Sequence, residues 1–273
     1  MEVSRSRYYQ YLERKKQYCP KEETILLNEI KTLDKLSNHS YGSRQMSENL
    51  KTKGYNIGRY AARTLMRKAG IVCVQRRRFK MATTNSHHSF RIAENKLNRQ
   101  FKVEAPNKVW VTDISYLWTF AGWLYIAGVL DLFSRRIVGW AMEDHMRSEL
   151  IEKALNMALG RRKPGTGLLH HSDRGVQYAC DNYQKKLKEA DIIVSMSRKG
   201  NCYDNAVMER FWGSLKSERT NGKEYLTQEE AKADVIDYIE MFYNSRRLHS
   251  TLNYVSPLQF ENDFRLKKVS TFT

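Results

Sequence analysis

The fold is constrained most by a change of pattern near residue 108, where short apolar runs typical of β-strands replace helical periodicity. Three such runs, at residues 109–117, 123–130 and 136–142, are joined by short connections, which predicts two antiparallel hairpins. Helices and strands then alternate, with helices at 148–159, 181–190 and 204–219 and strands at 167–172 and 192–197. This order predicts an α/β fold, a mixed five-stranded sheet with helices on both faces.

Three acidic residues occupy unusual places in this pattern. Asp113 lies in the middle of an apolar run, where a buried carboxylate is costly unless it is paired or bound to a metal. Asp173 ends an inner strand, the position at which open α/β sheets bind ligands. Glu209 lies within a helix, and 35 residues (positions 174–208) separate it from Asp173. Two aspartates on strands and one glutamate on a helix can hold two Mg²⁺ ions on a phosphodiester.

Each acid also has an ordinary structural interpretation. Asp113 could cap a turn, Asp173 could form one, and Glu209 could be a solvated helical residue. The helical spacing of Glu209, Gly213 and Lys216 places them on one stripe, where Lys216 could hold a phosphate beside the metal site.

Other polar residues in this region are weaker candidates. Asp131 has turn chemistry around it and Asp204 resembles a helix cap, so both are interpreted as structural. His170 and His171 are neighbours on one strand, which makes them a poor metal chelate, although one of them could touch the site. Ser172 stands beside His171 but lacks a nucleophile elbow and an oxyanion loop, which disfavours a serine hydrolase.

The first third of the chain predicts a small helical domain. Helices are expected at residues 22–36, 43–53 and 57–69, with a glycine-containing turn before the last, which is typical of a helix-turn-helix. In the third helix, Ile57, Ala61 and Leu65 are expected to face the core. The opposite face carries Arg59, Arg63 and Arg67, which either contact DNA or form an ordinary solvated basic face.

These patterns divide the chain into four parts. A helix-turn-helix domain is expected at residues 20–72, a basic linker at 73–103, an α/β core at 104–222 and a helical extension at 223–264. In the linker, Arg76, Arg77, Arg78 and Lys80 could lie along a DNA backbone or form a plain tether. In the extension, Thr227 and Glu230 predict a capping box at the start of a helix over 227–243.

The charge of the chain points to a polyanionic partner. Its net charge is +17 and its isoelectric point about 9.7, which favours nucleic acid or an anionic membrane. A membrane is disfavoured because no apolar run approaches the roughly 20 residues of a spanning helix, and the N-terminus does not resemble a signal peptide. Four scattered cysteines without a CxxC pair favour the cytoplasm.

Five segments together resemble a known family. They are "WVTDISYL", "DLFSRRIVGW", "HSDRGVQY", "SMSRKGNCYDNAVMERFWGSLKSE" and "YNSRRLHSTLNYVSP". In order and spacing they resemble the second-reading-frame product of bacterial insertion-sequence transposases of the IS-three family, whose catalytic core is like that of retroviral integrases. The resemblance extends from about Glu22 to Pro257.

The resemblance implies a ribonuclease-H-like fold and a DDE transposase that cleaves DNA 3′ ends and transfers strands during transposition. It places Asp113, Asp173 and Glu209 on the catalytic and metal-binding triad, with two Mg²⁺ ions that Mn²⁺ can replace. Lys216 falls on the basic residue seven positions after the glutamate. The implied partners are terminal inverted repeats, target DNA, further copies of the chain and the first-frame product, joined by frameshifting, in a bacterial cytoplasm at the nucleoid. A hydrolytic nuclease of the same fold and a non-catalytic helix-turn-helix regulator remain the alternatives.

Overall fold

The computed structural model describes residues 4–9, 20–73, 89–198 and 202–270, in two compact units spanning Met1–Val74 and Gln75–Thr273. The basic residues at positions 76–80 lie outside the described ranges. Within the described part of the chain, no helix combines the length and apolar character needed to cross a membrane.

The N-terminal unit consists of α2 (Pro20–Leu36), α3 (Ser43–Thr52) and α4 (Arg59–Lys68). Apolar side chains of all three helices are buried between them: Ile30, Leu33, Met46, Leu50, Ala62 and Met66. The turn from α3 to α4 contains Gly54 at a φ of +90°, a conformation that glycine adopts without strain. The predicted helix-turn-helix arrangement is therefore present.

The core-facing side of α4 differs from the prediction. Ala61 is exposed, Ile57 precedes the helix, and the buried residues are Ala62 and Met66. Adjacent positions on a helix differ by about 100°, so the helix is turned by one residue relative to the expected stripe. With Ala62 and Met66 buried, Arg59, Arg63 and Arg67 are exposed, as predicted.

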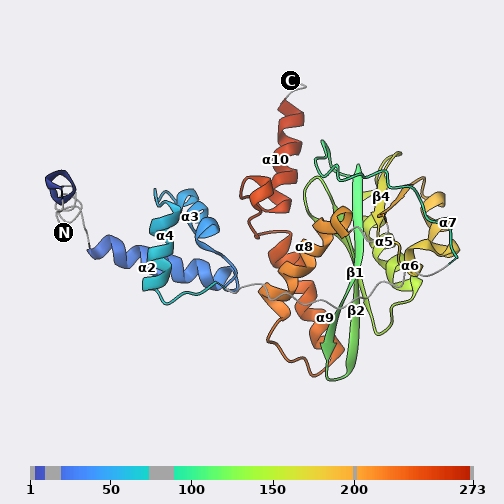
Figure 1. The fold of residues 1–273 in the computed structure, drawn as a ribbon, viewed down its shortest axis with the longest axis horizontal. Coiled ribbons are helices and arrows are strands. Elements are labelled where there is room, and N and C mark those ends of the chain that lie inside the picture. The colour runs from blue at the N-terminus through green and yellow to red at the C-terminus, as the bar shows by residue number, and fades with distance from the viewer. Residues whose placement is uncertain (1–3, 10–19, 74–88, 199–201, 271–273) are drawn as a thin grey trace. The chain divides into compact units, whose positions relative to one another are not determined.

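The C-terminal unit is built on the predicted five-stranded mixed sheet, in the order β3-β2-β1-β4-β5. Figure 1 labels β1, β2 and β4 of this sheet. Its strands are β1 (Val109–Thr119), β2 (Gly122–Asp131), β3 (Ile137–Glu143), β4 (Leu169–Ser172) and β5 (Ile193–Met196). β1, β2 and β3 are antiparallel neighbours, whereas β4 runs parallel to both β1 and β5. This is a ribonuclease-H-like arrangement, with β1 at the centre of the sheet.

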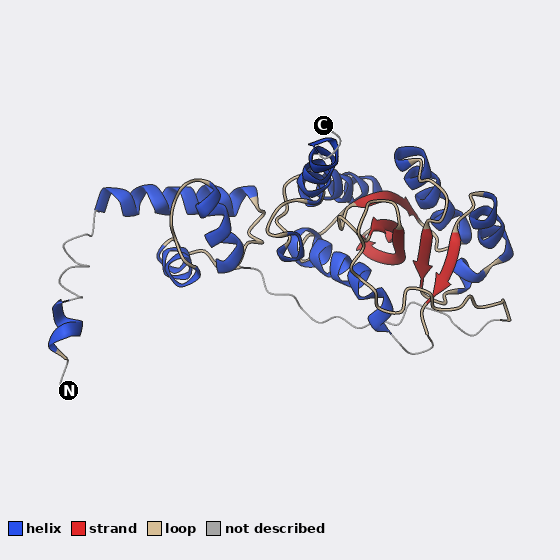
Figure 2. Ribbon diagram, turned by 90° about the horizontal axis from the view of Figure 1, so that it is seen from above, coloured by secondary structure: helices blue, strands red, loops and turns tan. Residues whose placement is uncertain are grey.

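Helices cover both faces of this sheet (Figure 2). One face packs against α5 (Ser148–Arg162), with α6 (Val176–Ala179) and α7 (Asp181–Glu189) beside it. Gly139 of β3 allows close packing here, since a Cβ atom would lie 2.2 Å from the carbonyl oxygen of Ala154 on α5. The other face packs against α8 (Ala206–Leu215) and α9 (Gln228–Asp237).

Two predicted helices are less regular than expected. The helix predicted over 204–219 consists of a 3₁₀ turn (η1, Cys202–Asn205), α8 and a π-helical turn (η2, Lys216–Thr220). The helix predicted over 227–243 consists of α9 and a second π-helical turn (η3, Tyr238–Tyr243). A 3₁₀ turn (η4, Ser250–Leu252) and α10 (Pro257–Ser270) complete the unit.

The predicted capping box at the start of α9 is half formed. The Thr227 side chain accepts a hydrogen bond from the Glu230 backbone N–H at 3.1 Å, as expected of an N-cap. The Glu230 carboxylate, however, accepts from the backbone N–H of Leu226 at 3.0 Å, one residue before the cap.

Candidate active site

The three acids of the sequence pattern come from three elements that meet beside β1. Val111 of β1 pairs with His171 of β4 in parallel register, so Asp113 and Asp173, each two residues further on, lie at the same level of the sheet. Asp173 directly follows β4, and its Oδ1 accepts a hydrogen bond from the Gly175 backbone N–H at 2.8 Å. The two carboxylates are thus brought together by strand pairing.

Glu209 reaches the same region from α8. Asp113 pairs across the hairpin with Gly128, and a Cβ atom on Gly128 would lie 3.1 Å from side-chain atoms of Met208 and Trp212. The absence of a side chain at Gly128 therefore lets α8 pack directly on the sheet beside Asp113. Met208, Phe211 and Leu215 are buried, as predicted, and Glu209 remains exposed.

The electrostatics of Asp113 show that the acids interact. Burial raises the pKa of the Asp113 carboxyl well above its usual range, and the negative charges of Asp173 and then Glu209 raise it further. Loss of hydration also raises the pKa of Glu209. An accumulation of carboxylates whose ionisation is disfavoured creates a site at which a cation would be strongly stabilised.

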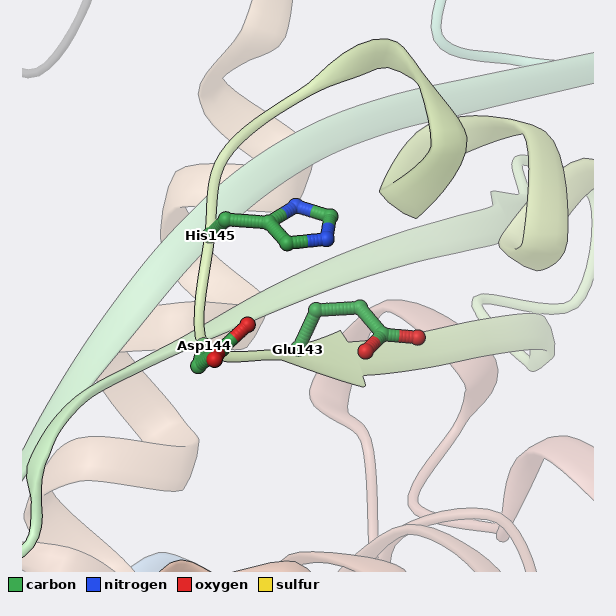
Figure 3. Close-up of side chains that lie close together, drawn as sticks. All are labelled: Glu143, Asp144 and His145. Atoms are coloured by element: carbon green, nitrogen blue, oxygen red, sulfur yellow. The ribbon is translucent and has the colours of Figure 1, made fainter.

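The three carboxylates are more widely spaced than the ligands of a single ion. Among the described residues, the one set of three or more acidic, histidine or cysteine side chains with ligand atoms all within 4.8 Å of one another is Glu143, Asp144 and His145 (Figure 3). These consecutive residues lie at the end of β3, and Glu143 forms an ion pair with Lys153. The wider spacing of Asp113, Asp173 and Glu209 suits carboxylates that are shared by two metal ions about 3.5–4 Å apart.

Lys216 lies beside the acids, at the start of the π-helical turn η2. Its Nζ sits 4.5 Å from the centroid of the Tyr116 ring on β1. Burial lowers the pKa of the Lys216 ammonium, and the charge of Asp113 opposes that shift. Among the described acidic side chains, none forms an ion pair with Lys216 within 4.0 Å, so the ammonium is available to an anionic ligand.

Sequence reasoning missed two neighbours of Asp113. The Trp212 indole N–H is buried, lies close enough to lower the pKa of Asp113, and does not reach hydrogen-bond geometry with any described group. The Tyr178 hydroxyl lies 3.3 Å from the Thr112 hydroxyl, and the charges of Asp113 and Asp173 add to burial in raising its pKa. Trp212 stands three residues after Glu209, a spacing that places both on one side of a helix and could have identified it.

Two rival acids have structural roles. Asp131 is fully buried and accepts hydrogen bonds from the backbone N–H groups of Asn107 (2.8 Å) and Phe133 (3.0 Å), with Arg162 at 3.2 Å. The expectation that Asp204 caps a helix is wrong, because Asn205 is the N-cap residue of α8. Asp204 instead accepts a hydrogen bond from the Asn95 side-chain amide at 2.6 Å.

The histidines are structural as well. His170 is bonded to the Tyr183 hydroxyl at 3.0 Å, and His171 to the hydroxyls of Ser195 (2.8 Å) and Ser197 (3.1 Å). Burial lowers the pKa of His170 to about 3 and that of His171 to about 4, so both are neutral at pH 7. The hydroxyl of Ser172 donates to the backbone carbonyl of Asp173 and not to His171.

Comparisons with known proteins agree with this geometry. Models of an integrase core domain match residues 103–202 and 209–264, and a model of an HTH-like domain matches residues 20–79. The chain is 42% identical over 262 residues to the insertion element IS600 uncharacterized 31 kDa protein of Shigella sonnei, covering 96% of each chain. It is 40% identical to transposase InsF for insertion sequence IS3A of Escherichia coli (strain K12), covering 83% of this chain and 78% of that protein.

A solved structure also resembles the chain. It is the simian T-cell lymphotropic virus intasome in complex with PP2A regulatory subunit B56 gamma, with a TM-score of 0.48, 14% identity, and coverage of 79% of this chain and 70% of that one.

An integrase core next to an HTH-like domain defines an enzyme of the DDE-type transposase and integrase class, the polynucleotidyl transferases. At 42% and 40% identity over most of its length, the chain belongs to the IS-three (IS3) family of insertion-sequence transposases.

Proposed function

We propose that Asp113, Asp173 and Glu209 are the catalytic carboxylates, and that the enzyme uses them to cleave the 3′ ends of its insertion element and join them to target DNA. The observation that carries this is the electrostatic coupling of Asp113 to both other acids, at the level of the sheet where β1 and β4 separate. Asp131, by contrast, forms a buried ion pair with Arg162.

The donor set fits Mg²⁺, since carboxylate oxygens are its preferred ligands and the charges of Asp173 and Glu209 both act on the buried Asp113. Asp113, Asp173 and Glu209 would hold two ions, and Mn²⁺ could substitute. When bound, the ions supply positive charge to the attacking oxygen and to the leaving 3′ oxygen.

The protein side chains contribute orientation. The central strand fixes Asp113, and the Gly175 N–H fixes one oxygen of Asp173. Lys216, held on the Tyr116 ring, would bind a phosphate next to the scissile one. Water first replaces the 3′ oxygen on phosphorus and leaves a 3′-hydroxyl. That hydroxyl then attacks a second phosphodiester, so one P–O bond forms and one breaks in each step.

The remaining assignments follow from the same function. Arg59, Arg63 and Arg67 on the exposed face of α4 would contact DNA. The helix-turn-helix domain would span residues 20–72, the catalytic core 104–222 and the helical extension 223–264, with a linker at 73–103. The active form would be a multimer on DNA, and a frameshift fusion to the first-frame product would add recognition of the terminal repeats. Competition between a repeat and scrambled DNA tests the last point, because the chain alone is expected to discriminate by much less than about 10³-fold.

The test of the catalytic assignment compares Glu209→Gln with Glu149→Gln. Both residues are exposed and both lie in the first turn of a helix, α8 and α5 respectively, so the effect on helix stability is matched. A plasmid carrying the ends of the element that encodes this chain is incubated with the protein and with Mg²⁺, Mn²⁺ or EDTA. Glu209→Gln is expected to abolish release of the 3′-hydroxyl, whereas Glu149→Gln retains it.

The same assay separates the alternatives. A hydrolytic nuclease would nick the ends without joining them to a target plasmid, and a regulator would bind without nicking. Normal cleavage by Glu209→Gln would refute the assignment of Glu209.

A further inference from the structure

The far end of the β1–β2 hairpin exposes a group of aromatic side chains. Trp118 is 53% exposed and Trp123 38% exposed, and Phe120 in the turn is 63% exposed. Large aromatic side chains dominate the energetics of cores and interfaces because each buries a large apolar area. Exposed apolar patches of this kind are typical of binding sites.

Three aromatic rings are arranged in order along the hairpin. Trp118 and Trp123 are cross-strand partners with ring centroids 4.9 Å apart, and Trp123 packs against Tyr116 at 5.3 Å. Tyr116 and Trp118 are two residues apart, which places them on the same face of β1. We call Tyr116, Trp118 and Trp123 the aromatic ladder.

The inner end of the ladder contacts Lys216. Tyr116 is three residues from Asp113 on the same strand, about 10 Å at the usual rise, and Trp118 is about 17 Å away. The Lys216 ammonium stands on the Tyr116 ring and interacts electrostatically with Asp113. Because side chains alternate along a strand, Tyr116 and Asp113 leave opposite faces of β1, and Lys216 is the group that interacts with both.

We propose that the aromatic ladder stacks on unpaired bases of the DNA, roughly three to five nucleotides from the phosphate at the carboxylates, given about 3.4 Å per nucleotide in one strand. This rests on the proposed function, which puts DNA at Asp113. Every base has a π-face that an exposed aromatic ring can bind without sequence preference, but in a duplex those faces are covered by neighbouring bases. The DNA next to the cleavage point would therefore be opened on this surface.

The proposal favours DNA over a second protein chain because of the charge at the inner end of the ladder. Lys216 complements a phosphate, and it contacts the innermost ring of the ladder while interacting with the charge of Asp113. An interface between copies of the chain would have no need of a cation shared by the rings and the carboxylates.

The test compares two DNA duplexes of equal length and charge, one fully paired and one with mismatches in the five terminal base pairs. Binding is measured without divalent metal, so it does not depend on cleavage. Trp118→Ala is expected to lower affinity for the mismatched duplex at least fivefold, the lower end of the range for one lost base–aromatic stack. Affinity for the paired duplex should change less than twofold, and Trp118→Phe should recover most of the loss.

Leu266→Ala provides a matched control, because Leu266 is a 69% exposed apolar residue on α10. It is expected to bind both duplexes normally. A second measurement uses the unaltered chain and needs no variant: 2-aminopurine in the mismatched segment should lose fluorescence on binding, while the same base in the paired segment should not.

Three results would overturn the proposal. They are equal losses on both duplexes, no loss on either, and a Trp118→Ala variant that changes oligomeric state while still preferring mismatched DNA. The proposed function fails on a different result, normal cleavage by Glu209→Gln, which leaves these metal-free binding measurements interpretable.

Discussion

Replacing Arg247, a buried partner of Glu218, should strongly destabilise the C-terminal unit. Its guanidinium donates to both carboxylate oxygens of Glu218, from Nε to Oε2 at 2.8 Å and from Nη2 to Oε1 at 2.6 Å. The Tyr238 hydroxyl donates to the same carboxylate at 2.7 Å. Only 12% of the Arg247 side chain and 9% of the Glu218 side chain are exposed. This is a buried, two-point ion pair that joins η2 to the loop after η3.

The expected magnitude follows from what Arg247→Met leaves behind. Methionine fills much of the space, but the Glu218 carboxylate stays buried with only the Tyr238 hydroxyl as partner among these groups. Removing one member of a buried pair costs about 3–5 kcal/mol because the other charge is left uncompensated. Hydrogen bonding to Glu218 also raises the pKa of Arg247, so its charge is retained at any accessible pH.

The double variant Glu218→Gln with Arg247→Met separates charge from packing. Glutamine removes the buried charge and still accepts a hydrogen bond from Tyr238, so the double variant should lose less stability than Arg247→Met alone. Neighbouring groups typically show interaction energies of about 0.5–3 kcal/mol.

Urea unfolding followed by tryptophan fluorescence is a suitable assay. The chain has five tryptophans, all between positions 110 and 212, so the signal follows the C-terminal unit alone. A loss below about 1 kcal/mol for Arg247→Met, or strictly additive losses in the double variant, would refute this account of the pair.

Three further predictions concern the acids and the helix-turn-helix. Because the pKa of Asp113 is raised in the folded state, its contribution to stability is fully present below about pH 3.9, the unfolded value, and is lost as pH rises through the folded pKa. Asp113→Asn should therefore raise the melting temperature measured in EDTA at pH 7. An unchanged or lower melting temperature would contradict this. Asp131→Asn should cost about 1.5–3 kcal/mol in urea unfolding, through weakened hydrogen bonds to a charged group, and retain cleavage. Replacing Arg59, Arg63 and Arg67 with alanine should reduce the slope of log affinity against log salt by roughly 0.9 for each phosphate that is no longer neutralised, whereas Lys31→Ala, an exposed change on α2, should leave the slope unaltered.

The strands could be predicted from the sequence because their signals are local. Apolar runs with short connections fixed three antiparallel strands, and the alternation that followed placed the other two and the helices between them. The rotation of α4 could not be predicted in the same way. Ala61 and Leu65 share the four-residue spacing of Ala62 and Met66, and packing against α2 and α3, distant in sequence, decides which pair is buried.

The candidate site shows the same division. An aspartate inside an apolar run and an aspartate after an inner strand are visible in the sequence, and parallel pairing of β1 with β4 is enough to bring them together. Gly128 could not be recognised as part of the site from the sequence. Its role, like the packing of Trp212 beside Asp113, depends on α8 lying directly on β2, a contact between segments about 80 residues apart.

The position of Lys216 depends on both kinds of information. Its spacing of seven residues from Glu209 is two helical turns, which predicts that both side chains lie on one side of the helix. Yet Lys216 begins a π-helical turn, and such turns are rare and cluster at functional sites. The Glu218–Arg247 pair spans 29 positions and ties η2 to a loop that no local pattern connects with it. The seven-residue spacing thus places Lys216 on the same side of the helix as Glu209. The buried Glu218–Arg247 ion pair, which involves a distant segment, stabilises the π-helical turn η2 on which Lys216 lies.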